Sequence, residues 1–239
     1  EAVGQVAEPR RPKTKKVRRG YNLFTREYLS GLHTHTHLCG MSAAGLLPPF
    51  RRLYAKARTE TENWAALQSR LEVQAASAVN IFERLPALQD AANYGVLSAG
   101  EGLPQKVYFK QLRALEALLQ RMQSTLNDME GVVTTLGRLS TEGGKLGSDG
   151  KGLSATALFL RSGAHPCPSE CSEGLHDIWH MHRSELALKH ALLRALSSYS
   201  TSPGDLSELL ACLEDEPNID PSRVEGLIYR VMCTVPVEQ

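Results

Sequence analysis

Residues Tyr108–Leu136 read YFKQLRALEALLQRMQSTLNDMEGVVTTL, and this stretch decides the fold. Apolar side chains recur along it at alternating spacings of four and three without a break. A strict seven-residue repeat keeps one apolar seam facing a neighbouring helix. The stretch therefore predicts a long helix over about 104–139, whose seam pairs either within the chain or with a partner protein. The seam residues are Tyr108, Leu112, Leu115, Leu119, Met122, Leu126, Met129, Val133 and Leu136.

A second helical pattern precedes this stretch. Apolar residues recur at spacings of three and four over 61–85, with Thr61 as a plausible N-cap and Pro86 as a stop. The two patterns predict a long antiparallel helical hairpin or coiled coil.

Three further helices are expected toward the C-terminus, over about 169–199, 205–213 and 222–233. The first of them would pack on the hairpin as a third member, and the two short ones would close one end. No segment alternates as a strand does, so we expect an all-α fold.

The segments between these helices are rich in Gly, Pro, Ser and charged residues. We expect a disordered basic tail and linker over 1–58, interrupted by a short helix at about 21–32. A helical bundle domain would follow over 59–239, with flexible loops at about 90–103 and 140–168.

The net charge of +1 conceals an asymmetry. Seven of the 27 Lys and Arg residues lie in residues 1–19, so the rest of the chain carries 20 against 24 of the 26 acidic residues. No apolar run is long enough for a membrane span, and no secretory signal pattern opens the sequence. The five cysteines are odd in number and irregular in spacing, which suits reduced thiols in the cytosol or nucleus.

The basic tail carries a short pattern typical of nuclear import. Its residues are Lys13, Lys15, Lys16, Arg18 and Arg19. We expect a nuclear protein with some cytoplasmic population. The stretch 12–29 is also similar to the opening of an HMG box, with Tyr21 and Phe24 as the aromatic pair, so a DNA-binding tail is an alternative.

Histidines and cysteines gather at two places. His33, His35 and His37 alternate just before Cys39, in a segment without strand character, where a linker is the better interpretation. The second cluster consists of Cys167, Cys171, His176 and His180. Its Cys pair and His pair are too close for a zinc finger, so structural histidines are favoured and a zinc site is the alternative. No cofactor is expected.

Enzyme signatures are missing from the sequence. No glycine loop has the strand and helix that phosphate binding needs, and no G-x-S-x-G or H-E-x-x-H pattern occurs. Two short motifs of low specificity remain: Arg51-Arg52-Leu53-Tyr54, an Arg-x-Leu-aromatic pattern used to dock cyclins, and Ser202-Pro203, a minimal phosphorylation site. A solvent-exposed linker would account for both.

Three stretches carry a family resemblance. They are Asn63–Leu67 with Ala78–Leu85, the heptad helix, and His182–Lys189 (HRSELALK). On these stretches, over about 60–235, the chain resembles the cyclin-dependent kinase 2-interacting protein family. His182 stands where that family has an aromatic residue.

This resemblance implies a nuclear adaptor without an active site. It implies roles in DNA replication and in checkpoint and damage signalling, with cyclin-dependent kinase, cyclin and replication factors as partners. It also implies a helical partner subunit and a AAA-type ATPase, acting in replisome turnover and maturation of the 60S ribosomal subunit.

Overall fold

The chain is described by a computed structural model that covers residues 43–99, 102–148, 158–161, 165–197 and 203–233. These residues belong to a compact unit, Gly40–Gln239. Its elements are α1 (Ala43–Gln89), the 3-10 helix η1 (Ala91–Ala99), α2 (Leu103–Ser148), α4 (Pro168–Ser197), α5 (Pro203–Glu214) and α6 (Pro221–Met232). No β-strand occurs in these ranges, and the all-α prediction is confirmed.

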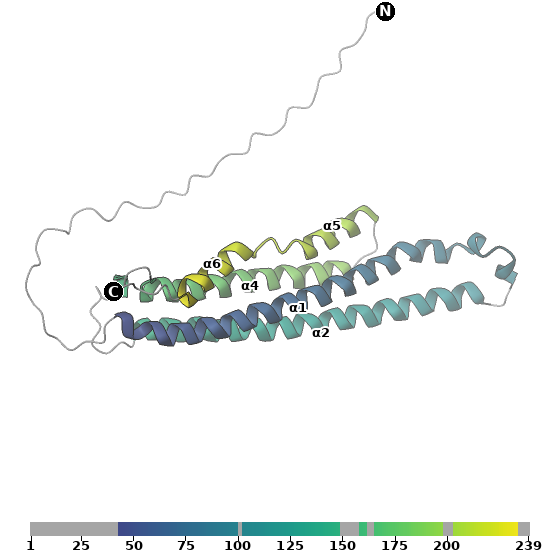
Figure 1. Cartoon of the computed structure of the whole chain (residues 1–239). Helices are drawn as coiled ribbons and strands as arrows, with labels where there is room; N and C mark the ends of the chain where they lie inside the picture. Colours follow the sequence, from purple (N-terminus) through teal and green to yellow (C-terminus); the bar gives the residue numbers. More distant parts are fainter. Residues whose placement is uncertain (1–42, 100–101, 149–157, 162–164, 198–202, 234–239) are drawn as a thin grey trace, which may run out of the picture. The chain divides into compact units, whose positions relative to one another are not determined.

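Helices α1 and α2 form the predicted hairpin. They lie side by side and antiparallel, with η1 joining their outer ends, and α4 packs along α2 as the third long helix (Figure 1). Helices α5 and α6 pack mainly on α1 and also touch α4. A supercoiled pairing of α1 and α2 stays a prediction.

Helix α1 begins 18 residues before the predicted start, at Ala43 instead of Thr61. The tail and linker predicted over 1–58 are therefore wrong for residues 43–58, although Pro48 and Pro49 lie there. Proline holds φ near its helical value, and its cost in a helix comes from the lost hydrogen bond and from crowding against the preceding turn. Burial of Leu46, Phe50 and the residues that follow offsets that cost.

The other two predicted boundaries of this helix are wrong as well. Thr61 lies inside α1, where its hydroxyl donates to the Arg58 carbonyl at 2.8 Å instead of capping an N-terminus. Pro86 does not stop the helix, which continues to Gln89. The loop predicted over 90–103 is largely the ordered η1 turn, which is kinked at Gly95.

Helix α2 continues through the glycines that predicted a linker from residue 140. It ends at Ser148, and Gly143 is buried inside it. A Cβ at Gly143 would lie 2.8 Å from Leu175 Cδ1 of α4 and 3.5 Å from Phe50 Cε1 of α1. This glycine therefore permits close packing of three helices, which local composition does not reveal.

A second close approach fastens α4 to α1. The buried Tyr54 hydroxyl of α1 donates to the Cys171 carbonyl of α4 at 2.9 Å. It lies so near Gly174 that a Cβ there would collide with it. Burial raises the pKa of Tyr54 well above its ordinary value, so the phenol stays a hydrogen-bond donor.

Helix α6 is capped at both ends and is held by side-chain contacts. Asp220 caps α6 by accepting from the Arg223 amide at 3.0 Å, with Pro221 at the first helical position. Arg51 of α1 donates to the Val231 carbonyl at 3.2 Å, and Arg223 pairs with Asp177 of α4 at 2.6 Å. These contacts hold α6 against α1 and α4.

None of the helices in the ranges described above is long and apolar enough to cross a bilayer.

Candidate functional site

The predicted seam of α2 contributes to the core of this chain. Six of its nine residues are buried, whereas Tyr108, Leu112 and Leu119 are half-buried. The buried six are Leu115, Met122, Leu126, Met129, Val133 and Leu136. Since α1 and α4 pack on α2, the seam residues are used within the chain, and a partner would bind α2 on another side.

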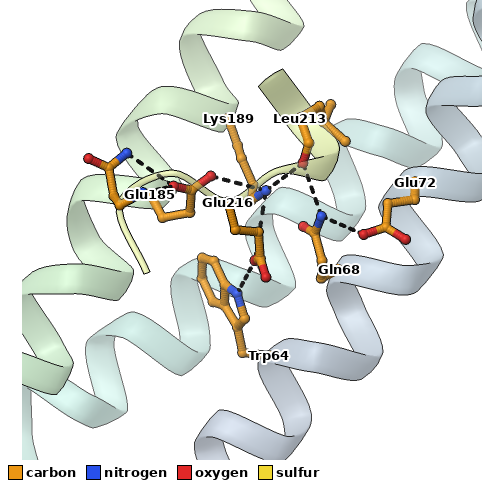
Figure 2. A network of polar contacts seen from close by, with 8 residues as sticks. Trp64, Gln68, Glu72, Glu185, Lys189, Leu213 and Glu216 are labelled. Atoms are coloured by element: carbon orange, nitrogen blue, oxygen red, sulfur yellow. Dashed lines mark hydrogen bonds and ion pairs between the residues drawn. The ribbon is translucent and has the colours of Figure 1, made fainter. Parts of the chain in front are cut away.

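A buried polar cluster joins the C-terminal unit to the long helices. This polar latch consists of Trp64, Gln68, Glu185, Lys189 and Glu216 (Figure 2). Lys189 and Glu185 lie one turn apart on α4, and both side chains are fully buried. The Lys189 ammonium lies 3.2 Å from Glu185 Oε1 and 3.9 Å from Glu216 Oε1. The Glu185 contact is a charge pair, since its Oε1 accepts no directed hydrogen bond.

The latch also satisfies the carboxyl end of α5. Lys189 Nζ and Gln68 Nε2 donate to the Leu213 carbonyl at 2.9 Å and 3.0 Å. Gln68 donates as well to Glu72 at 2.7 Å. Glu185 Oε2 accepts from the backbone and side-chain nitrogens of Asn218, both at 3.0 Å. Charged groups thus hold the α5–α6 connection by its backbone, which fixes its position against α4.

Glu216 is the most constrained member of the latch. Its φ of 44° lies in the left-handed region, which costs a non-glycine residue about 1 kcal/mol or more. Its carboxylate accepts from Trp64 Nε1 at 2.7 Å. Burial raises the pKa of Glu216, although the Trp64 bond and Lys189 lower it. The contacts with Trp64 and Lys189 hold this backbone conformation in place.

His182 lies beside the latch and is also buried. Its ring meets Trp64 edge to face at 5.1 Å, and its Nδ1 donates to the Ile178 carbonyl at 2.7 Å. Burial lowers the pKa of His182, so the neutral ring is favoured. His182 therefore acts as a packed core residue.

Sequence reasoning did not identify the latch, although a signal was present. Trp64 lies in the Asn63–Leu67 stretch, and Glu185 and Lys189 lie four residues apart in the His182–Lys189 stretch. Charged residues at that spacing usually lie on a solvated face. Only the packing of α5 and α6 shows that this pair is buried.

Two grooves run along the face of α2 that α5 and α6 leave uncovered. The first lies between α2 and α4 and has a volume of about 720 Å³. The second lies between α1 and α2 and has a volume of about 630 Å³. Both are bordered by Glu142 and Lys145, so they flank one ridge of α2. We call this surface the grooved face.

The grooved face has apolar floors and a basic rim. Val133, Trp179 and Leu186 line the first groove, and Leu53 and Leu146 line the second. Five basic side chains border the grooves against two acidic ones. The basic residues are Arg52, Lys56, Arg138, Lys145 and Arg183, and the acidic ones are Glu130 and Glu142.

An aromatic centre marks the first groove. The Arg183 guanidinium lies 5.2 Å from the centroid of Trp179, and His176 meets the same ring at 5.3 Å. Arginine over tryptophan is a favourable cation–π arrangement. Aromatic and arginine side chains are also those that most often anchor protein interfaces.

The structure does not bring the proposed metal ligands together. Cys167 and Cys171 are buried, whereas His176 and His180 are exposed on another side of α4. Within the described ranges, no group of three or more His, Cys, Asp or Glu side chains could hold a metal ion. Burial raises the pKa of Cys171 to about 12, which keeps the thiol protonated.

Cys167 has a structural position at the start of α4. Its amide donates to Glu170 at 2.9 Å, an arrangement that satisfies one free N–H of the first turn. Arg161 and this amide bond lower the pKa of Glu170 to about 2.

The position of the cyclin-docking pattern does not suit docking. Arg51–Tyr54 lies in α1 and not in an exposed linker, and Leu53 and Tyr54 are buried in the core. A docking leucine and aromatic residue would have to leave that core. The import residues 13–19, the HMG-like stretch, the 33–39 cluster and Ser202 all lie outside the described residues.

Comparison with known proteins corrects the family. The chain matches no curated protein significantly. Residues 45–237 do match the family CA109-like, described as ribosome biogenesis protein C1orf109-like. The resemblance to the cyclin-dependent kinase 2-interacting protein family is therefore wrong, and the HMG-like opening has no support. Tandem amphipathic helices of similar composition explain the first error. The match covers most of the chain, including every element that forms the core, and the chain belongs to the C1orf109-like family of ribosome biogenesis proteins.

Proposed function

We propose that this protein is a non-catalytic adaptor in ribosome biogenesis, which binds a helix of a partner protein on its grooved face. The complex would serve a AAA-type ATPase during maturation of the 60S subunit. The observation that carries the proposal is the grooved face, in a family named for ribosome biogenesis.

The chemistry of the face favours an amphipathic helix. Two adjacent grooves with apolar floors accept apolar side chains at helical spacing. The excess of basic residues on the rim favours acidic residues on the flanks of the partner helix. Exposed small residues on the walls, such as Thr134, Thr141 and Ala187, leave room for close approach of its backbone.

The ATPase and the cellular location are the finer parts of the proposal. A rigid helical body with no expected cofactor suits a subunit that connects other proteins. The basic cluster at 13–19 would direct the adaptor to the nucleus, where ribosomal subunits are made. Replication, checkpoint and cyclin partners depended on the family resemblance that proved wrong, and they are not proposed.

Filling the first groove tests the adaptor proposal. Ala187→Trp places a bulky ring on the exposed wall of the groove without replacing a core residue. The control is Ala66→Trp, at an exposed position of α1 that borders neither groove. Each tagged full chain is purified from cells, and its bound proteins and 60S precursors are quantified.

We expect the wild type and the control to retain a helical partner and a AAA-type ATPase subunit. The Ala187→Trp variant should lose the helical partner by roughly tenfold or more and accumulate unfinished 60S subunits. Equal recovery with both variants, or no such proteins with the wild type, would overturn the proposal.

A further inference from the structure

Exposed apolar side chains gather at the outer end of the hairpin. Val96 and Leu97 of η1 are 91% and 61% exposed, and Phe109 in the second turn of α2 is 58% exposed. Helix η1 packs against α2, and Figure 1 shows it at the turn of the hairpin, beyond α4 and α5. We call these three residues the apolar knob. Val96 and Leu97 are adjacent in the chain, and Phe109 lies on the helix that η1 packs against. Exposed apolar groups that gather in one region of a folded chain mark interaction sites.

The η1 turn, which carries Val96 and Leu97 of the knob, is held by side-chain hydrogen bonds. Asn93 Nδ2 donates to the Ala87 carbonyl at 2.9 Å, and the Tyr94 hydroxyl donates to the Leu88 carbonyl at 3.0 Å. Gln89 Nε2 donates to the Tyr108 hydroxyl at 2.8 Å, which ties α1 to α2. Gly95, with φ of 50°, supplies the bend that comes just before Val96.

The Asn93 and Tyr94 side chains of η1 thus satisfy two free carbonyls at the end of α1. Val96 and Leu97 are thus exposed on a turn that hydrogen bonds hold in place. Order before binding reduces the entropy lost when a partner binds.

The charged side chains of α2 nearest to the knob are all basic. Residues 91–99 contain no charged side chain, and α2 has no acidic residue before Glu116. Lys106, Lys110 and Arg113 are exposed on its first three turns. No carboxylate in the described ranges forms an ion pair with them. A partner that covers the knob would gain from acidic groups at the edge of its pocket.

The small area of the knob decides what kind of partner it fits. A stable dimer buries about 800 Å² on each side, and three side chains on a convex turn supply only part of that. Side chains that project in this way act as anchors in a pocket. We propose that the knob inserts into an apolar pocket with an acidic rim on a second folded protein. This contact is separate from the grooved face.

Site-specific photocrosslinking in cells tests the proposal on the full chain. A benzophenone amino acid is placed at position 96, 97 or 109, and at Val73 as the matched control. Val73 is 68% exposed on α1 and lies outside the knob. The three knob positions should crosslink to one protein, within one apolar depression bordered by Asp and Glu. Val73 should not crosslink there.

Charge reversal then tests the acidic rim. Lys106→Glu combined with Lys110→Glu should reduce the knob crosslink roughly tenfold, while the partner of the grooved face still co-purifies. Conversely, Ala187→Trp should leave the knob crosslink unchanged, so the two proposals can fail separately.

Three results would overturn the proposal. The first is crosslinking to a second copy of this chain, together with sedimentation of the purified protein as a dimer that Val96→Asp abolishes. The second is crosslinks that are scattered, or the same as those from Val73. The third is flotation of the purified protein with lipid vesicles that depends on Val96 and Leu97, because the knob would then be a lipid contact.

Discussion

The two ends of the α1–α2 hairpin differ in what surrounds them. At the inner end, α4, α5 and α6 cover the hairpin, and the latch buries Lys189 and Glu185 completely. At the outer end, no side chain is fully buried among the described residues of 80–97 and 102–114. The same two helices are thus the core of a bundle at one end and a two-helix projection at the other.

This difference determines how easily each end of the hairpin can open. Buried apolar groups and satisfied charges supply folding free energy, so the inner end should open only in global unfolding. An isolated helical pair with half-buried contacts has much less to lose on opening. The outer end should therefore open at a lower free-energy cost than the inner end.

Removing the latch ammonium should have the largest effect. Lys189→Ala leaves Glu185 buried without a counter-charge, and loss of one partner of a buried pair costs about 3–5 kcal/mol. Urea unfolding measures the change. Hydrogen exchange should show the inner end losing its protection, so that it resembles the outer end. The control is Arg84→Ala at the outer end, where an exposed arginine donates to Asn80, and it should cost about 0.5 kcal/mol or less. An unchanged Lys189→Ala stability would contradict the role given to the latch.

Adding a methyl group to Gly143 should have an intermediate effect. Its Cβ would press on Leu175 Cδ1, and overpacking typically costs about 1–3 kcal/mol. Gly131 lies in the same helix with nothing within 4 Å of its Cβ position, so Gly131→Ala should stabilise the protein by up to about 1 kcal/mol. Opposite signs in thermal unfolding would support three-helix packing at the inner end. Equal stabilisation by both substitutions would show that α4 does not approach α2 so closely.

Acidification should weaken the inner end by the smallest amount. The pKa of His182 is lowered in the folded state from an ordinary value of 6.5, mainly by burial. Its contribution to folding stability is present above pH 6.5, and it is lost as the pH falls through the pKa of the folded state. Glu216 has a pKa raised by burial, so its contribution to folding stability has the opposite pH dependence. It is present below pH 4.5 and is lost as the pH rises through the pKa of the folded state.

The His182→Gln variant isolates the histidine term. Its stability should fall less than that of the wild type between about pH 8 and about pH 5.5. His180→Gln, at an exposed position of the same helix, is the control. A steeper fall in His182→Gln than in the wild type would show that the buried ring is not kept neutral.

Periodicity predicted the parts of the fold that depend on one helix at a time. The heptad series located α2 and its buried side, and the predicted α4, α5 and α6 lie within a few residues of the observed ones. Local rules failed where tertiary contacts outweigh them. Pro48 and Pro49 stand in a helix that Phe50 and Tyr54 anchor, and Gly143 is in the helix because α4 needs its space.

The candidate sites were less predictable because they combine distant segments. The latch joins distant residues, such as Trp64 with Glu216, which lie 152 positions apart in the sequence. The basic residues of the grooved face come from α1, α2 and α4, so they lie together only in the folded bundle. The outer turn was expected as a flexible loop, and its exposed Val96 and Leu97 gave no periodic signal.

The sequence contains two tryptophans, and the fold places one at each of two sites. Trp64 is buried in the latch with its ring nitrogen bonded to Glu216, and Trp179 is half-buried in the first groove beneath Arg183. Indole emission shifts to the red as water reaches the ring. A Trp179→Phe variant would therefore report the opening of the latch by fluorescence alone, and a Trp64→Phe variant would report occupancy of the groove. The wild-type chain thus carries two optical reporters without any added label.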